Sequence, residues 1–282
     1  MSRFLNESAV LEEIGRRSAS VREIKRKSMY ERVPIEELYE TAFVEGEGIG
    51  TAYEYLVKWR VLLRLFKHQI RNILVLGLPE KYGASMDFVL LADHQGCCVT
   101  ILDDRCKSVL KCRDVLREMN ERGLIHKIPK VIEVDDLLDR QEQIGLFDLA
   151  VSCEVLQRVA PVKRKDYIMN SLSIARYVAV FVPNKANGSH AKISKLGAIE
   201  LGELHSLFNG YRIIDEGYVD MPPFPPGLKR RSKTPARRSC RHLQDKIIVR
   251  LLDAWSRVEK VYTVFKIRNS HIVFVMAATP PN

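Results

Sequence analysis

Acidic side chains stand directly after three apolar runs of the chain, where ligand-contacting residues of an α/β protein lie. Each carboxylate has two oxygens at a fixed spacing, so it can accept hydrogen bonds from both hydroxyls of a ribose diol, or from an adenine amino group. A single Asp in such a place is equally typical of a helix N-cap. The prediction of a ligand site therefore depends on finding several acids at neighbouring strand ends. The residues just after these runs are Asp103, Asp104, Asp135, Asp136, Cys153 and Glu154.

A turn bracketed by glycines follows an earlier apolar run, in the stretch ILVLGLPEKYG at residues 73–83. Gly77 and Gly83 allow the backbone to approach a ligand closely. The amides of Leu78 and Glu80 can donate hydrogen bonds, whereas Pro79 has no amide hydrogen. The turn is therefore predicted to contact a nucleotide-like cofactor.

Apolar runs and amphipathic stretches alternate from residue 71 onward. The apolar runs are nearly continuous, which is typical of strands covered on both faces. Their order predicts an α/β fold, a Rossmann-like doubly wound sheet that is seven-stranded and mostly parallel. Strands are expected at 73–77, 97–102, 131–134, 147–152, 177–182, 211–220 and 271–277. Helices are expected at 51–70, 104–120, 199–208 and 243–258, whereas 260–267 fits either a helix or a strand.

The stretch FDLAVSCEVLQRV at 147–159 resembles the fourth-strand region of class I S-adenosylmethionine-dependent methyltransferases, commonly FDLVVSxEVLEHV. VTILDD at 99–104 and VIEVDD at 131–136 are similar to the acidic motifs after strands two and three of that family. The resemblance covers roughly residues 71–220, with 271–277 as the final antiparallel strand. It implies a helical N-terminal cap over 1–70 and a methyltransferase-like domain over 71–282.

The resemblance implies a role for each site residue toward S-adenosylmethionine. Gly77, Leu78, Pro79 and Gly83 would line its methionine and ribose part. Asp103 would hold the ribose hydroxyls, with Asp104 as a neighbour. Asp135 and Asp136 would contact adenine, and Cys153 and Glu154 would border the methionine end. The reaction would be in-line transfer of a methyl group from sulfonium to a nucleophile, in which the protein positions the reactants and excludes water. No metal is expected.

The chain departs from the family pattern at three places. The loop after the first strand lacks the usual acid and GxGxG pattern, and Gln157 and Arg158 stand where Glu and His are common. These departures favour an alternative function, a methyltransferase-like binding module that keeps the fold and is catalytically weakened.

Four further residues are candidate substrate contacts. Tyr53 and Tyr55 follow the glycine-rich stretch EGEGIG at 45–50, where the family often has a lid; otherwise they pack inside a helix–helix connection. Asn184 and His190 lie after the fifth strand, where they would orient a nucleophile or take its proton, or belong to an exposed polar loop.

Positive charge is concentrated in one segment. The chain has a net charge of +10, and residues 228–250 hold nine Lys or Arg residues and one Asp. A basic insertion at 228–246 is therefore expected, whose part 228–241 would contact RNA phosphates or an acidic protein, or form a solvated loop. Residues 228–246 contain no Phe, Tyr or Trp, which disfavours stacking on single-stranded RNA.

Composition narrows the class of protein. The six cysteines form no CxxC pair, which favours reduced thiols in a cytoplasmic protein. No run of 18 apolar residues is present, so neither a membrane span nor a membrane partner is expected, and the N-terminus has no apolar stretch typical of a secretory signal. The function expected is methyl transfer from S-adenosylmethionine to a small-molecule acceptor; an RNA-modifying methyltransferase is the other enzymatic alternative.

Overall fold

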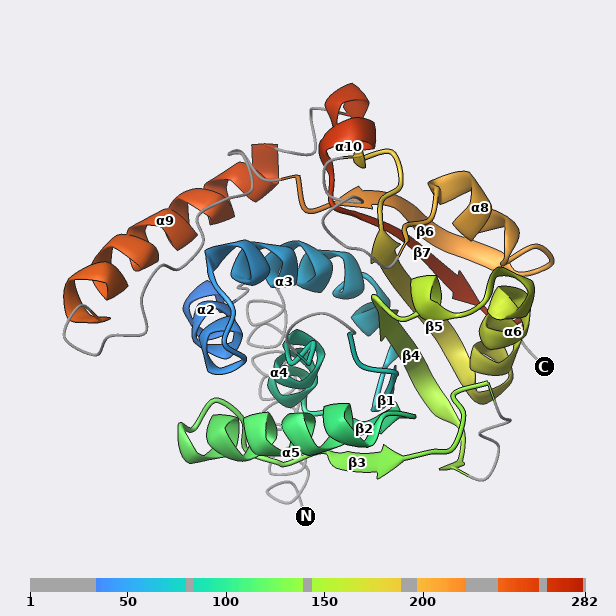
Figure 1. Ribbon diagram of the computed structural model, residues 1–282, viewed down its shortest axis with the longest axis horizontal. Helices are drawn as coiled ribbons and strands as arrows, with labels where there is room; N and C mark the ends of the chain where they lie inside the picture. Colours follow the sequence, from blue (N-terminus) through green and yellow to red (C-terminus); the bar gives the residue numbers. More distant parts are fainter. Residues whose placement is uncertain are drawn as a thin grey trace, which may run out of the picture. The chain divides into compact units, whose positions relative to one another are not determined.

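A single sheet organises the molecule, with strand order β3-β2-β1-β4-β5-β7-β6 (Figure 1). The computed structural model describes residues 34–79, 84–138, 144–188, 197–221, 238–258 and 263–280. The chain divides at Pro34, and Ile35–Asn282 form one compact unit. The strands are β1 Asn72–Leu76, β2 Cys98–Asp103, β3 Lys130–Glu133, β4 Phe147–Cys153, β5 Ala175–Pro183, β6 Arg212–Val219 and β7 Ile272–Ala278.

All neighbouring strands pair in parallel except β7, which is antiparallel to both β5 and β6. This confirms the predicted seven-stranded, mostly parallel, doubly wound sheet and the antiparallel final strand. Gly217 lies within β6, and the register between β6 and β7 shifts between Ile213 and Asp215. The undecided stretch 260–267 contributes to a helix, Thr263–Asn269 (α10).

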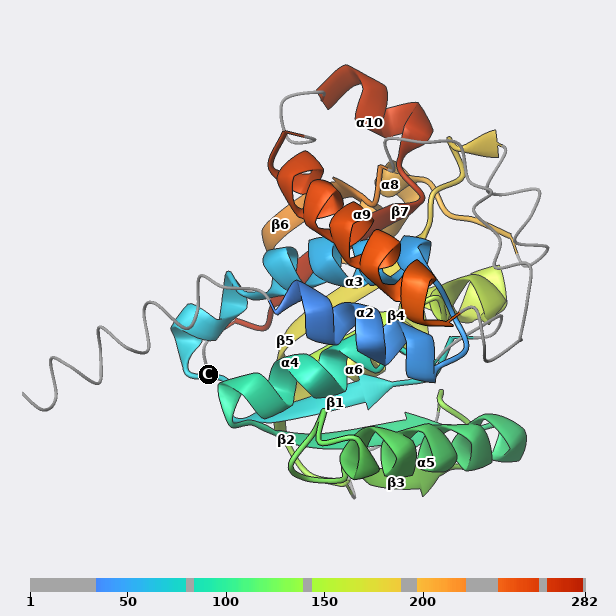
Figure 2. The same ribbon diagram turned by 90° about the vertical axis from the view of Figure 1, so that its left-hand side faces the viewer.

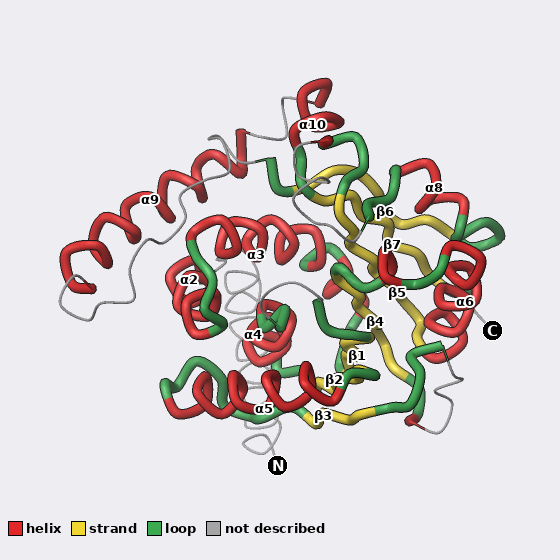
Figure 3. Tube along the Cα trace, viewed as in Figure 1, coloured by secondary structure: helices red, strands yellow, loops and turns green. Residues whose placement is uncertain are grey.

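Helices cover both faces of the sheet (Figures 1 and 3). Helices α3, α4 and α5 lie on one face, with α2 packed against all three, and α6 and α8 lie on the other. Figure 2 shows α9 running alongside α2 and α3, which it contacts. The helices are α2 Ile35–Val44, α3 Ile49–Leu62, α4 Asp87–Gln95, α5 Cys106–Glu121, α6 Arg164–Ile174, α8 Leu201–Ser206 and α9 Arg238–Val258.

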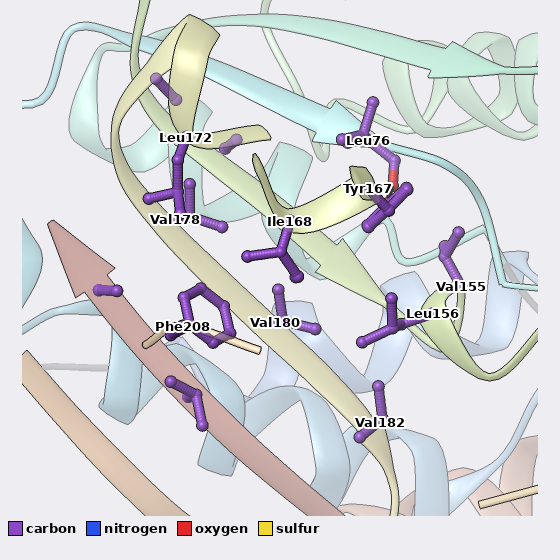
Figure 4. Close-up of a cluster of buried hydrophobic side chains, with 14 of the residues drawn as sticks. Leu76, Val155, Leu156, Tyr167, Ile168, Leu172, Val178, Val180, Val182 and Phe208 are labelled. Atoms are coloured by element: carbon purple, nitrogen blue, oxygen red, sulfur yellow. Dashed lines mark hydrogen bonds between the residues drawn. The ribbon is translucent and has the colours of Figure 1, made fainter. Parts of the chain in front are cut away.

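Strand residues alternate between two apolar layers because successive side chains point to opposite faces. On the α6 and α8 side, Val178, Val180 and Val182 of β5 pack with Ile168 and Phe208 in a buried cluster (Figure 4). On the opposite side, Phe181 of β5 lies between Phe88 of α4 and Phe274 of β7, with ring centroids 6.2 and 5.8 Å apart. Both faces are therefore dry, as the continuous apolar runs predict.

The strand register brings three chain segments together at the carboxyl edge of the sheet. Leu76 pairs with Leu102 and Val75 with Val151, so the segments after β1, β2 and β4 lie side by side. The amide of Gly77 then donates to the carbonyl of Leu102 over 2.8 Å. Below this edge, the hydroxyl of Tyr167 hydrogen-bonds the carbonyl of Leu76 (2.8 Å) and the hydroxyl of Ser152 (2.8 Å).

Gly77 marks the closest approach at this edge. Its φ is +81°, and a Cβ built on it would lie 2.8 Å from both terminal carbons of Val155 and 3.0 Å from Leu137. Only glycine combines this backbone conformation with that packing. The glycine predicted to admit a ligand therefore also lets the segment after β4 close against β1.

Replacing Gly77 with Ala tests this packing, and Gly123→Ala is the matched control, because Gly123 has φ +71° but no atom within 4 Å of its Cβ position. Both variants acquire backbone strain, but only Gly77→Ala is also overpacked. We expect a loss of about 3–5 kcal/mol in the free energy of unfolding for Gly77→Ala and about 1–2 kcal/mol for Gly123→Ala. Urea denaturation measures both, and equal losses would contradict the packing argument.

Candidate functional site

Asp103 is the centre of the carboxyl edge. Its side chain has no solvent exposure, and its carboxylate accepts hydrogen bonds from the amide of Leu78 (2.6 Å) and the amide of Arg105 (2.9 Å). The guanidinium of Arg105 donates to both carboxylate oxygens, each over 2.9 Å. A buried carboxylate requires this number of donors because its desolvation is otherwise uncompensated.

Two arginines join Asp103 to its surroundings. Arg105 also donates to the carbonyls of Leu78 (2.6 Å) and Pro79 (3.4 Å), so it ties the loop after β1 to the end of β2. Arg158 approaches Asp103 to 3.4 Å and donates to Asp104 over 2.9 Å. The departure from the family pattern at position 158 thus supplies a second cation for the acidic pair after β2.

The other predicted cofactor contacts lie around this centre. Leu78 and Pro79 are buried and adjoin Asp103, and Gly83 lies outside the described residues. Beyond β3, Asp135 is exposed and Asp136 is half-buried, where its carboxylate accepts from the amide of Leu138 over 2.8 Å. At the end of β4, Cys153 is buried and the half-buried Glu154 has a φ of +52°.

A buried lysine that sequence reasoning missed lies next to Cys153. Lys58 of α3 is fully buried, and its ammonium lies 2.7 Å from Glu54, 3.3 Å from Asp87 and 3.3 Å from the sulfur of Cys153. The ammonium also lies 4.9 Å from the ring centroids of both Tyr55 and Phe88. The residues Glu54, Lys58 and Asp87 are called the lysine cluster below.

Burial and neighbouring charges shift the pKa values of the buried groups in and around the lysine cluster. Burial disfavours the charged ammonium, but the negative charges of Asp87 and Glu54 hold the pKa of Lys58 above its ordinary value. Burial raises the pKa of Asp87 to about 6, with the nearby ammonium of Lys58 opposing the shift. The thiol of Cys153 has a pKa above its ordinary value, chiefly because of burial, so it is a neutral neighbour of the lysine.

A second buried acid holds the start of α4. Glu45 accepts hydrogen bonds from the hydroxyl of Tyr55 (2.7 Å), the amide of Met86 (3.0 Å) and the amide of Ala84. Burial raises the pKa of Glu45 to about 7, against the effect of these hydrogen bonds. The carboxylate fastens the segment after α2 to the segment that leads from the β1 loop into α4.

Of the four predicted substrate contacts, three are buried and one lies outside the described residues. Tyr53 and Tyr55 are 1% and 2% exposed, so both side chains pack inside the α3 layer. Asn184 is buried at the end of β5, where its amide donates to the carbonyls of Ile267 and Ser270 over 2.8 and 2.9 Å. His190 lies outside the described residues, as does the part of the basic insertion before residue 238.

The nucleoside part of S-adenosylmethionine carries hydrogen-bond donors that an acid such as Asp103 can accept from. Asp103 presents acceptor oxygens beside the backbone of Gly77 and Leu78, which is the chemistry that a ribose diol needs. Its donor Arg105 is 26% exposed and can turn outward, which frees carboxylate lone pairs for two hydroxyls. The described residues therefore fit the group once Arg105 moves.

Within the described ranges, no three His, Cys, Asp or Glu side chains are grouped so as to hold a metal ion. None of the helices in the described part of the chain is both long enough and apolar enough to span a bilayer.

Comparison with known proteins gives similarity of structure only. No protein-family model matches the chain, and no curated protein matches it in sequence. Among solved structures, magnesium protoporphyrin IX methyltransferase (ChlM) from Synechocystis PCC 6803 is similar in two forms. The form with bound S-adenosylmethionine has a TM-score of 0.47 and 12% identity over 82% of this chain and 81% of that chain. The form with bound S-adenosylhomocysteine has a TM-score of 0.49 and 13% identity over 82% and 86%.

The methyltransferase domain of bacterial CtHen1-CN is also similar, with a TM-score of 0.49 and 12% identity over 79% of this chain and 98% of that chain. These similarities fall below 25% identity and below a TM-score of 0.5. The strand order of this chain and its antiparallel β7 agree with the Rossmann-like sheet that the sequence predicts.

The raised pKa of Glu45 predicts a pH dependence of stability. Between its ordinary value of 4.5 and its folded value of about 7, the folded protein keeps a proton that the unfolded chain has released. The free energy of unfolding should therefore fall with rising pH in this window, by about 1.4 kcal/mol per unit relative to Glu45→Gln. Urea denaturation from pH 4.5 to pH 7 measures the difference. Glu118→Gln, which changes a surface carboxylate paired with Arg122, is the control. Parallel plots of the free energy of unfolding against pH for wild type and Glu45→Gln would contradict the prediction.

The lysine cluster predicts a strong coupling between Lys58 and Asp87. Lys58→Met removes the cation and leaves the buried carboxylate of Asp87 and the partly exposed carboxylate of Glu54 without it, so we expect a loss of about 3–5 kcal/mol. Lys58→Met combined with Asp87→Asn should recover a large part of that loss, because the second change removes the unpaired charge. Thermal and urea unfolding of the two single variants and the double variant measure the coupling, and additive losses would contradict it.

Proposed function

We propose that the protein is an S-adenosylmethionine-dependent methyltransferase that acts on a small-molecule acceptor in the cytoplasm. The observation that carries the proposal is the hydrogen bond between Asp103 at the end of β2 and the amide of Leu78 after β1. This contact sets the acceptor oxygens for a ribose beside a backbone that only glycine at position 77 permits. The five cysteines whose side chains are described are free thiols, in agreement with a reducing compartment.

The proposed roles follow from position at the carboxyl edge. Asp103 holds the ribose hydroxyls, and the backbone of Gly77, Leu78 and Pro79 lines the ligand, a role that the sequence also predicts for Gly83. Asp104 is the neighbour of Asp103 at the ribose. Asp135 and Asp136 would contact the adenine, and Cys153 and Glu154 would border the methionine end. When bound, the cofactor supplies a methyl group on a sulfonium, which is an electrophile. The protein's residues would orient the two reactants and exclude water from them.

Arg105 must move for this function. In the structure its guanidinium fills the donor positions that ribose hydroxyls would take on Asp103. The side chain reaches the site from the surface and is 26% exposed, so it can exchange its bonds to Asp103 for bonds to water. Arg158 keeps its ion pair with Asp104 and so retains a cation beside the acidic pair.

One observation favours a second function, a methyltransferase-like binding module. Arg105 and Arg158 together satisfy the carboxylate of Asp103 without any ligand, so the fold is complete in itself. In this alternative, Asp103 only stabilises the fold. Transfer of a labelled methyl group from S-adenosylmethionine to any component of a cell extract would exclude the alternative.

Calorimetric titration with S-adenosylhomocysteine tests the proposed function. We expect saturable heat with the wild type and at least about a tenfold weaker affinity for Asp103→Asn, because two hydrogen bonds to a charged acceptor are weakened. Asp114→Asn, which changes an exposed acid of α5, is the control and should bind as the wild type does. No heat at millimolar ligand would contradict the proposal, and equal affinities for Asp103→Asn and wild type would contradict the role of Asp103.

A further inference from the structure

A cavity lies at the opposite edge of the sheet, the amino edge, where the parallel strands begin. Its volume is about 440 Å³, which is within the range of cavities that hold small molecules. Ile73 of β1 pairs with Leu149 of β4, and Leu149 pairs with Tyr177 of β5, so the residues just before these three lie side by side. The cavity is lined by Lys67, His68, Gln69, Arg71, Asp148 and Arg176.

Three cationic side chains of this cavity lack a carboxylate partner. Lys67, Arg71 and Arg176 are exposed, and no carboxylate in the described part of the chain forms an ion pair with any of them. Their ammonium and guanidinium groups also donate no hydrogen bond to another described residue. The N–H groups of these three side chains are therefore available to a ligand.

Asp148 is the acid among the lining residues, and the backbone holds it. Its oxygen Oδ2 accepts hydrogen bonds from the amides of Arg71 (2.8 Å) and Asn72 (3.0 Å). The carboxylate thus fixes the start of β1 and forms no ion pair with the side chains of the cavity. Three cations and one carboxylate leave the cavity with two positive charges in excess.

A buried aromatic ring positions two of the lining side chains. Tyr177 is 2% exposed, and its ring stacks on that of His68 with the centroids 5.3 Å apart. The guanidinium carbon of Arg176 lies 5.1 Å from the same ring centroid. A guanidinium that contacts a ring keeps N–H groups free to donate. His68 and Arg176 are thus oriented before a ligand binds, which lowers the entropic cost of binding.

The backbone turns sharply beside the cavity. Gln69 has a φ of +56°, and it follows the short 3₁₀ helix η1 Leu65–His68. This left-handed conformation costs free energy in a residue with a side chain and is held where the surrounding structure requires it. Lys67 and Arg71, on either side of Gln69, line the same cavity. The turn therefore brings together two cations that an extended chain would hold apart.

We propose that this cavity binds the phosphate group of a small phosphomonoester. The N–H groups of Arg71 and Arg176 form planar forks that match pairs of phosphate oxygens, and the ammonium of Lys67 adds a third positive charge.

The charge of the cavity favours a phosphate over a carboxylate. A phosphomonoester carries a charge of about −1.5 to −2 at pH 7, which is close to the excess positive charge of the cavity. A carboxylate carries a single negative charge and would leave a cation unpaired. This site goes beyond the proposed function, because it lies at the other end of the strands from Asp103.

Calorimetric titration with glycerol phosphate at constant ionic strength tests the site. We expect saturable binding to the wild type and at least about tenfold weaker binding to Arg176→Gln and to Arg71→Gln, because each loses a charge-assisted pair. Arg268→Gln is the matched control, because Arg268 of α10 is also an exposed arginine without a partner among the described residues. Acetate in place of glycerol phosphate should give no saturable heat.

Asp148→Asn tests the charge of the cavity in the opposite direction. The new side chain keeps an oxygen that can accept from the amides of Arg71 and Asn72, but it removes the negative charge. Glycerol phosphate should therefore bind about threefold more tightly. Asp114→Asn, which removes an exposed acid of α5, is the control and should leave the affinity unchanged.

The absence of saturable heat with glycerol phosphate, or equal affinities of wild type and Arg176→Gln, would overturn the proposal. Binding of phosphatidic acid vesicles or of RNA that depends on Arg176, without binding of glycerol phosphate, would also overturn it, because the ligand would then be a larger anionic surface. These titrations contain no S-adenosylhomocysteine, so their failure would leave the proposed function unaffected, and failure of the proposed function would leave this site unaffected.

Discussion

The buried carboxylate of Asp103 is the constraint on which the carboxyl edge depends. A fully buried charge is stable only when donors surround it. Here the donors come from the loop after β1, from the residue that precedes α5, and from the turn after β4. The charge therefore sets the positions of three segments that are distant in the chain. The proposed function assigns the nucleoside contacts to the same segments, so in that proposal folding and ligand recognition share the same contacts.

Pairs of opposite charge also fix side chains along the rest of the carboxyl edge. Lys58 is neutralised by Glu54 and Asp87, and His271 is held by Asp220. Each of these groups lies where one strand ends and a helix or another strand packs against it. Opposite charges thus replace water at an edge whose two faces are otherwise apolar, and they leave polar groups in fixed positions next to the end of β4. In the proposed function, these fixed polar groups would help to position the cofactor and the acceptor.

Local sequence patterns predicted the sheet because burial on both faces requires continuous apolar runs, and these are visible in residues such as 73–76 and 177–182. Gly77 and Asp103 were predicted for a related reason, since each lies at the carboxyl end of a strand. Lys58 was missed because it lies within the apolar helix α3, and its partners Asp87 and Cys153 are 29 and 95 residues away. No local pattern encodes an ion pair of that separation. The cavity at the amino edge was missed likewise, because its lining residues come from separate parts of the chain.

A crystal structure of the protein with S-adenosylhomocysteine tests the central claim most directly. The account predicts that the ligand lies at the carboxyl edge, that the carboxylate of Asp103 accepts hydrogen bonds from both ribose hydroxyls, and that the guanidinium of Arg105 has turned outward. A crystal soaked at saturating ligand in which Arg105 still fills Asp103, with the ligand absent or bound elsewhere, would contradict it.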